Sequence, residues 1–316
     1  AEFAREPDAF LGLLGLGLLA PGAEAGEPAG ASWLGRLKAA AAREFAAEGL
    51  PTRKVEAWKY TDLKPLAEIP FRRAEVQDDA DVRALPASLD LGSPQGYRLV
   101  FVNGRYRPDL SFCDLSEAGL RVVPLSADGD NEGGLAARLL GRIAPAAGQA
   151  LNAAGMADGV CLHVAAGVHL RRPIEIVSLG SATREPLAWH GRTLIVLDGG
   201  ARATIIEREG DAGEGLAPTL ANAVTEIALE AGAQLCHYRL QALGAAGFHI
   251  NSVAAALGSD AVYEAFTLTT GGRLARNETS VTLDVPGAQA RLAGAYLVDG
   301  SEHLDTTTLI EHRAPR

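Results

Sequence analysis

Short strands with alternating apolar and polar positions dominate the second half of the chain, with almost no helical periodicity. A turn residue followed by alanine opens successive strand pairs at Ala201, Ala233, Ala261 and Ala288, which are separated by 32, 28 and 27 residues. Repetition at such a period is expected of a solenoid, in which each coil covers the apolar face of its neighbour. The pattern therefore predicts a parallel β-helix with two strands in each coil, namely 201–207 with 223–229, 234–240 with 248–255, 262–269 with 279–285, and 289–298 with 303–311.

The first part of the chain has a different pattern. Apolar residues recur every four positions from Trp33 to Phe45, which predicts an amphipathic helix over residues 31–49. Further on, an Asn-Gly pair stands between the strand-like runs 97–102 and 105–110. Such a pair supplies the positive φ angles of a tight turn, so these runs are expected to form a hairpin.

A Gly- and Ala-rich helical interval, Glu132–Ala154, separates these elements from the repetitive strands. We therefore place a boundary near residue 150. Residues 1–150 are expected to form an N-terminal helical and α+β region, and residues 151–316 the β-helix core. The fold class predicted for the whole chain is mainly β.

Composition excludes several classes of function and location. A formal charge of −10 argues against a nucleic-acid partner, because phosphate neutralisation requires a basic surface. The apolar run Phe10–Ala20 is too short to span a bilayer and lacks the preceding positive charge of a signal peptide, so we expect a packed helix there and no membrane partner. Cys113, Cys161 and Cys236 form no CxxC, which disfavours a disulfide framework or zinc site and fits a reducing cytoplasm.

The chain contains none of the motifs GxSxG, HExxH and GxxxxGK[ST], so we expect no enzyme. The best ligand-like pair is His303 and Asp305, whose side chains point to the same side of a strand and could together bind ferrous iron. They could equally be ordinary polar residues on the outer face of a β-helix, because a usable site normally has more ligands. We therefore expect no tightly bound cofactor.

Alternation along another strand places Cys236 and Tyr238 on one face, and His237 and Arg239 on the opposite face. If Leu240 marks the interior, Cys236 is a buried and inert thiol.

One segment near the N-terminus, Leu50–Pro65, carries two aromatic residues among basic ones and reads LPTRKVEAWKYTDLKP. An anchoring segment, with packed aromatics and solvated charges, explains it better than a nucleic-acid patch does. With Gly191–Glu207 and Ala233–Ile250, this segment resembles the SufB/SufD family of iron–sulfur cluster assembly scaffolds, and the SufD branch fits better. Further family-like segments occur in the same order, at Phe101–Gly104, Leu151–Val168, Gly271–Glu278 and Tyr296–Pro315.

The resemblance implies a right-handed parallel β-helix and a scaffold subunit that acts with SufB and the SufC ATPase in iron acquisition and cluster formation. A transient iron or Fe–S cluster would then lie at a partner interface. The family's cluster-building Cys/His segment and its SufC docking region lie beyond Arg316, so no functional residue is carried over here. We also expect self-association, or a partner, to cover residues 303–312, because an unpaired strand edge is a template for pairing.

Two other β-helix functions fit the sequence less well. A polysaccharide lyase would need an export signal and a groove with clustered Asp, Lys or Arg, but the predicted β-helix contains no lysine. A hexapeptide-repeat acyltransferase needs a six-residue period, which is not found. Neither alternative explains the segment Leu50–Pro65.

Overall fold

A computed structural model describes residues 32–79, 82–83, 96–112, 119–129, 131–143, 149–211 and 217–313. The run Phe10–Ala20 and Cys113 lie outside these ranges. No helix among the described residues is long and apolar enough to cross a membrane.

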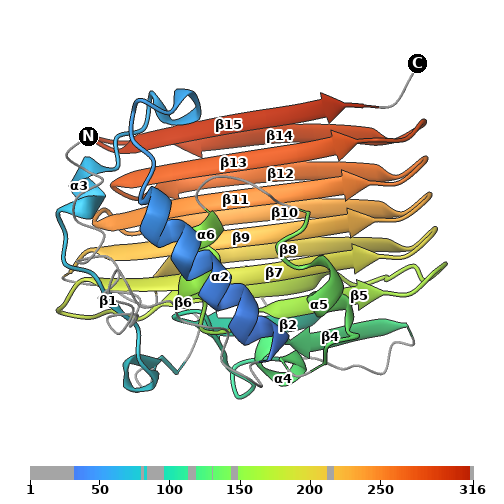
Figure 1. Ribbon diagram of the computed structural model, residues 1–316, viewed down its shortest axis with the longest axis horizontal. Helices are drawn as coiled ribbons and strands as arrows, with labels where there is room; N and C mark the ends of the chain where they lie inside the picture. The colour runs from blue at the N-terminus through green and yellow to red at the C-terminus, as the bar shows by residue number, and fades with distance from the viewer. Residues whose placement is uncertain are drawn as a thin grey trace.

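The repetitive part of the chain is a parallel β-solenoid with two long sheets (Figure 1). The first sheet has the order β15-β13-β11-β9-β7-β5-β4 and the second β14-β12-β10-β8-β6-β2-β3. The first contains β4 Leu120–Pro124, β5 Val160–Val164, β7 Leu187–Leu197, β9 Thr219–Leu229, β11 Gly247–Leu257, β13 Leu274–Leu283 and β15 His303–His312. The second contains β2 Tyr97–Val102, β3 Arg105–Tyr106, β6 Ile174–Gly180, β8 Arg202–Asp211, β10 Gln234–Leu243, β12 Val262–Gly271 and β14 Gln289–Leu297. The predicted parallel β-helix and all four predicted strand pairs are confirmed.

One corner of the solenoid repeats from coil to coil. Its turns stack residues with positive φ, namely Gly167, Gly200, Gly232, Asp260 and Gly287. Backbone hydrogen bonds connect successive turns, as from Gly200 N to Ala231 O at 2.9 Å. An alanine follows four of these residues, whereas Val168 follows Gly167; Ala201, Ala233 and Ala261 are completely buried in the core. This corner explains the pattern of a turn residue followed by alanine in the sequence. Glycine reaches positive φ without steric cost, and alanine is small enough for the narrow interior.

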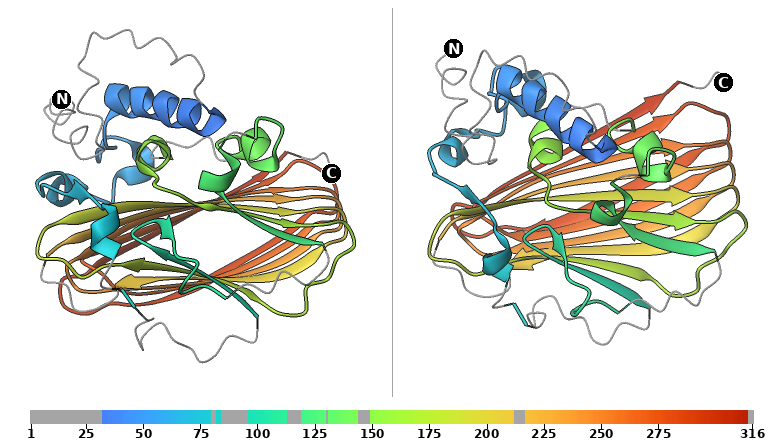
Figure 2. Two further views of the ribbon diagram at one scale, coloured as in Figure 1. Left: turned by 90° about the horizontal axis from the view of Figure 1, so that it is seen from below. Right: turned by 60° about the horizontal axis from the view of Figure 1, so that its bottom comes forward.

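The N-terminal elements cover the outer face of the first sheet, as Figure 2 shows. The helix α2, Trp33–Glu48, lies here with α6, Gln149–Gly155, and the predicted amphipathic helix is confirmed. The Ser32 side chain caps α2 by accepting from Gly35 N, and Gly49 ends the helix with a φ of 68°. Phe45 and Leu151 pack against the sheet, in one buried cluster with Ala188, Leu220 and Phe248.

Shorter elements complete this region. They are the 3₁₀ turns η2 Glu56–Trp58 and η3 Val76–Asp79, the helices α3 Lys64–Ala67, α4 Leu125–Asp128 and α5 Leu135–Leu139, and the two-residue strand β1 Arg72–Arg73. The strand β1 pairs in parallel with β7.

The predicted hairpin is confirmed, although its second strand is shorter than expected. β2 and β3 pair antiparallel, and the turn residues Asn103 and Gly104 have φ angles of 50° and 75°. β2 also pairs with β6, and β4 pairs with β5, so residues from both sides of position 150 share the two sheets.

Candidate functional site

The side chains that fill the interior of the solenoid change from apolar to polar along the strands. In β8 the inward side chains pass from Ala203 and Ile205 to Glu207 and Glu209, and in the neighbouring β10 they pass from Leu235 to a polar set. We call the polar stretch the lumen cluster; its buried members are Glu207, Glu209, Thr225, His237, Arg239, Gln241, His249, Asn251, Thr269 and Asn277, together with the Tyr263 hydroxyl. Burying polar groups costs free energy unless they are hydrogen-bonded or paired, so the lumen cluster requires partners inside the solenoid.

Glu207 is the centre of the lumen cluster. Arg239 Nε donates to Glu207 Oε2 at 2.9 Å, and His237 Nε2 lies 3.3 Å from the same oxygen. The Thr225 hydroxyl donates to Glu207 Oε1 at 2.8 Å. Because Thr225 belongs to the first sheet and Glu207 to the second, this contact crosses the interior and ties the two sheets together.

The electrostatics of the cluster favour charged carboxylates. Burial alone would raise the pKa of the Glu207 carboxyl, but His237, Arg239 and Thr225 outweigh it and lower that pKa to about 2. Burial likewise opposes ionisation of Glu209, yet the adjacent His249 imidazole and Arg239 lower its pKa. Both glutamates are therefore anionic at neutral pH, with Arg239 as their buried counter-ion.

Other members of the cluster have spare hydrogen-bonding capacity. His237 Nδ1 lies 3.0 Å from the Tyr263 hydroxyl, whose pKa is raised by burial. Within the described part of the chain, neither amide atom of Gln241 has a partner, and the same holds for Arg239 Nη1 and Asn251 Oδ1. Buried groups of this kind normally bind ordered water. The interior can therefore hold polar species that an apolar core would exclude.

No group of three His, Cys, Asp or Glu side chains within the described ranges is arranged to hold a metal ion. The lumen cluster is thus an ion-pair and hydrogen-bond network.

The candidate ligands His303 and Asp305 lie on the edge strand β15, outside the lumen cluster. Asp305 forms an ion pair with Arg276 and accepts a hydrogen bond from Thr61. His303 Nε2 is buried and has no partner among the residues described. Asp305 is therefore already engaged by a cation, and iron binding by the pair stays a prediction.

Arg276 connects the N-terminal segment Leu50–Pro65 to the end of the solenoid. Its guanidinium lies 4.1 Å from the centre of the Trp58 ring and donates to Ala57 O at 2.6 Å. It also pairs with Glu278. Trp58 is buried, as predicted for an anchoring segment, whereas Tyr60 is 75% exposed and does not pack as expected.

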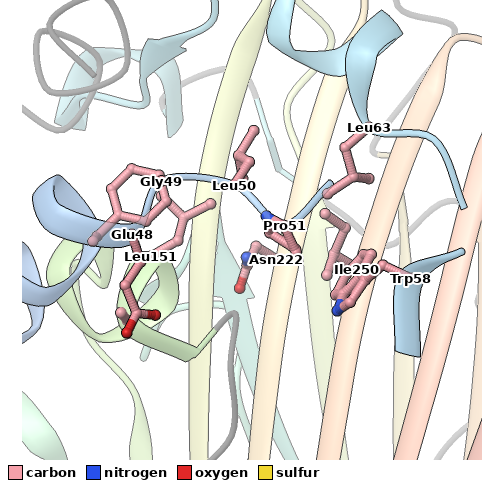
Figure 3. Close-up of a pocket in the computed structure, with 11 residues that line it drawn as sticks. Glu48, Gly49, Leu50, Pro51, Trp58, Leu63, Leu151, Asn222 and Ile250 are labelled. Atoms are coloured by element: carbon pink, nitrogen blue, oxygen red, sulfur yellow. The ribbon is translucent and has the colours of Figure 1, made fainter. Parts of the chain in front are cut away.

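The same segment forms part of a pocket on the outer face of the first sheet (Figure 3). The pocket also includes Leu151, Asn222 and Ile250. Its lining is almost entirely apolar, and Glu48 is its only charged residue.

The interpretation of Leu240 as an interior residue is wrong. Leu240 packs with Val100 and Val177 on the outer face of the second sheet, while His237 and Arg239 point inward. Cys236 is consequently a partly exposed free thiol on the outer face, and desolvation and the adjacent Glu264 raise its pKa. That direction disfavours the reactive thiolate.

The lumen cluster itself was not predicted from the sequence. One signal for it exists: Glu207 and Arg239 are 32 residues apart, which equals the separation of Ala201 and Ala233. Opposite charges one coil apart become direct neighbours in a parallel solenoid, as the register of β8 and β10 shows.

Comparison with known proteins assigns the family. The family model described as "SUF system FeS cluster assembly, SufBD core domain" matches residues 179–316, and "SufBD protein N-terminal region" matches residues 27–176. The chain belongs to the SufBD family. The SufBD core match thus begins at the end of β6 and contains the lumen cluster.

Two relatives show how much of a SufBD protein is present. An iron–sulfur cluster assembly SufBD family protein of Synechocystis is 27% identical over 84% of this chain and 60% of its own length. The iron–sulfur cluster assembly protein SufD of Escherichia coli is 30% identical over 84% of this chain and 59% of its own length. This SufBD chain therefore spans about three fifths of the length of these two relatives.

Proposed function

We propose that this SufBD chain is a SufD-like scaffold subunit in iron–sulfur cluster assembly, acting with a SufB-like subunit and a SufC-like ATPase. The observation that carries the proposal is the pair of SufBD family matches, which follow one another over residues 27–176 and 179–316. The similarity to a protein named SufD supports the choice of branch. The role is non-enzymatic, because scaffolding requires a rigid surface rather than a catalytic group.

The partner surface in this proposal belongs to the β-helix. The SufB-like subunit would bind it; a second copy of this chain is the alternative occupant.

Iron belongs to the proposal as cargo. The isolated chain would hold no stoichiometric iron, and a transient iron or cluster would form where the partner meets the strand that carries His303 and Asp305. The proposal also includes the cytoplasmic setting expected from the sequence.

The test is co-purification with SufB and SufC homologues from the same cells, followed by iron and sulfide analysis of the complex. Complexes that contain no SufB or SufC homologue would refute the proposed partners. One tightly held iron in the isolated chain, lost on His303→Ala, would show that this subunit carries a metal site of its own.

A further inference from the structure

The pocket of Figure 3 lies where α2 ends, and its lining joins five elements of the fold. Asn222 and Ile250 are register partners on β9 and β11. Phe45 comes from α2, Leu151 from α6 and Trp58 from η2. Because such side chains offer water few hydrogen bonds, an apolar group is favoured over water in this pocket.

One side of the pocket is open to solvent. Glu48, its only charged lining residue, is exposed, and Gly49 ends α2 with a φ of 68°. A Cβ added to Gly49 would meet nothing within 4 Å. Leu50 and Pro51, which follow in the chain, are only partly buried. A further stretch of chain can therefore approach the pocket from this side without displacing the backbone around it.

The run Phe10–Ala20, which lies outside the described ranges, needs an apolar surface to pack on. It contains one phenylalanine and six leucines among its eleven residues and carries no charge. Fully burying one such side chain contributes about 1.5–3 kcal/mol. The sequence predicts a packed helix for this run, and the pocket supplies an apolar surface close to the helix that follows it in the chain.

The link between this run and α2 is long enough to reach the pocket. Ala20 lies twelve residues before Ser32, the N-cap of α2, and an extended chain of that length spans about 40 Å. The pocket lies at the other end of α2, whose 16 residues measure about 24 Å. The intervening residues 21–31 include three glycines and two prolines and no large apolar side chain. The link therefore has no apolar group of its own to bury, and it can return the run along α2.

Attachment to the same chain favours this run over other apolar partners. A tethered segment reaches an effective concentration in the millimolar range when its link can span the distance. Tyr238 and Phe266 form another exposed apolar pair, but they are register partners on the second sheet. That sheet lies on the opposite side of the solenoid from α2, as Figure 2 shows.

We propose that Phe10–Ala20 binds, within the same molecule, in the pocket formed by Phe45, Leu151, Trp58 and Ile250. The leucines of the run pack against these side chains and exclude water from them. The contact holds the C-terminal end of α2 against the segment that carries Trp58. It does not depend on the proposed role in cluster assembly.

The experiment is hydrogen exchange of the intact chain, followed by mass spectrometry of peptides that contain residues 10–20. In the wild type these amides should exchange at least about tenfold more slowly than in variants whose pocket is blocked. Two variants block it: Glu48→Trp places an indole at the open side, and Ala150→Trp enlarges another lining residue. Ala46→Trp is the matched control, because Ala46 is exposed on α2 and does not line the pocket; it should exchange like the wild type.

Two further measurements keep the result clear. Circular dichroism during thermal unfolding shows whether each variant is folded, and Glu48→Trp should keep the wild-type fold because Glu48 is exposed. Exchange of residues 10–20 should also be unchanged over about a hundredfold range of protein concentration, because the contact forms within one molecule.

Exchange of residues 10–20 in the wild type at the rate of an unstructured peptide would overturn the proposal. Protection that persists in every folded pocket variant, or that is lost equally in Ala46→Trp, would overturn it too, because the run would then pack elsewhere. Protection that rises with protein concentration would assign the pocket to the run of a second copy, and that result would also contradict the proposal.

Discussion

The two halves of the solenoid interior are built from the same strands but held by different forces. Toward the glycine-alanine corner the interior is a stack of apolar residues such as Ile205, Ile227 and Val253. Toward the opposite corner the strands β8 to β13 contribute the lumen cluster, centred on Glu207 and Arg239. Apolar contacts are non-directional and tolerate small shifts, whereas the buried ion pair requires both partners in place. The polar half therefore makes the alignment of neighbouring coils depend on specific residues.

Replacing one member of the buried pair tests this difference most strongly. Glu207→Met should lower the free energy of unfolding by about 3–5 kcal/mol, because it leaves Arg239 buried without its main counter-charge. Urea unfolding followed by circular dichroism measures the change. In the apolar half, Ile227→Val should cost only about 0.5–1.5 kcal/mol.

The double variant Glu207→Met/Arg239→Met completes this cycle. It should recover most of the lost stability, since an apolar pair of similar volume leaves neither charge unpaired. A double variant no more stable than Glu207→Met would show that the two halves do not differ as described.

Acid should also distinguish the two halves. The folded pKa of Glu207, about 2, lies below its ordinary value of 4.5, so its contribution is complete above pH 4.5 and is lost as the pH falls toward 2. This one group should account for about 3 kcal/mol across that window. As the pH falls, the free energy of unfolding should therefore decrease more for the wild type than for the double variant. The difference in the free energy of unfolding between Ile227→Val and the wild type should stay the same at every pH. Parallel curves for the wild type and the double variant would contradict the assigned role.

Arg276 is a buried arginine outside the lumen cluster, and loss of one of its partners should lower the free energy of unfolding by less than loss of Glu207 does. Asp305→Asn should cost about 1–2 kcal/mol, because Arg276 keeps Glu278, the Ala57 carbonyl and the Trp58 ring. Limited proteolysis near residue 60 should report the same loosening of the N-terminal segment. A loss as large as that of Glu207→Met would mean that the outer contact, not the lumen cluster, dominates.

Much of the fold could be predicted from the sequence because its signals are local. The strand pairs, the turn before Ala233 and the Asn103-Gly104 hairpin depend on residues adjacent in the chain. The inward face of β10 could not be predicted in this way. There, apolar Tyr238 and Leu240 alternate with polar residues, and the polar set points inward because its partners lie on other coils. Local alternation alone therefore selected the wrong face for Leu240.

The candidate site was harder to predict for the same reason. His303 and Asp305 were correctly placed on one strand, but the guanidinium of Arg276, a register neighbour from the preceding coil, engages Asp305. The lumen cluster joins residues 8 to 40 positions apart, and the stacking of strands from both sheets brings them into contact.

The two corners of the solenoid also differ in how they accommodate changes of chain length. At the glycine-alanine corner the links 198–201, 230–233 and 258–261 are each four residues long. At the opposite corner the links 212–218, 244–246 and 272–273 have seven, three and two residues. The shortening of the repeat from 32 to 28 residues thus falls entirely at the second corner, and the register between coils is unaffected. Insertions and deletions can accumulate there during evolution, and a foreign peptide inserted between Leu243 and Gly247 would leave the stack of turns on the other side intact.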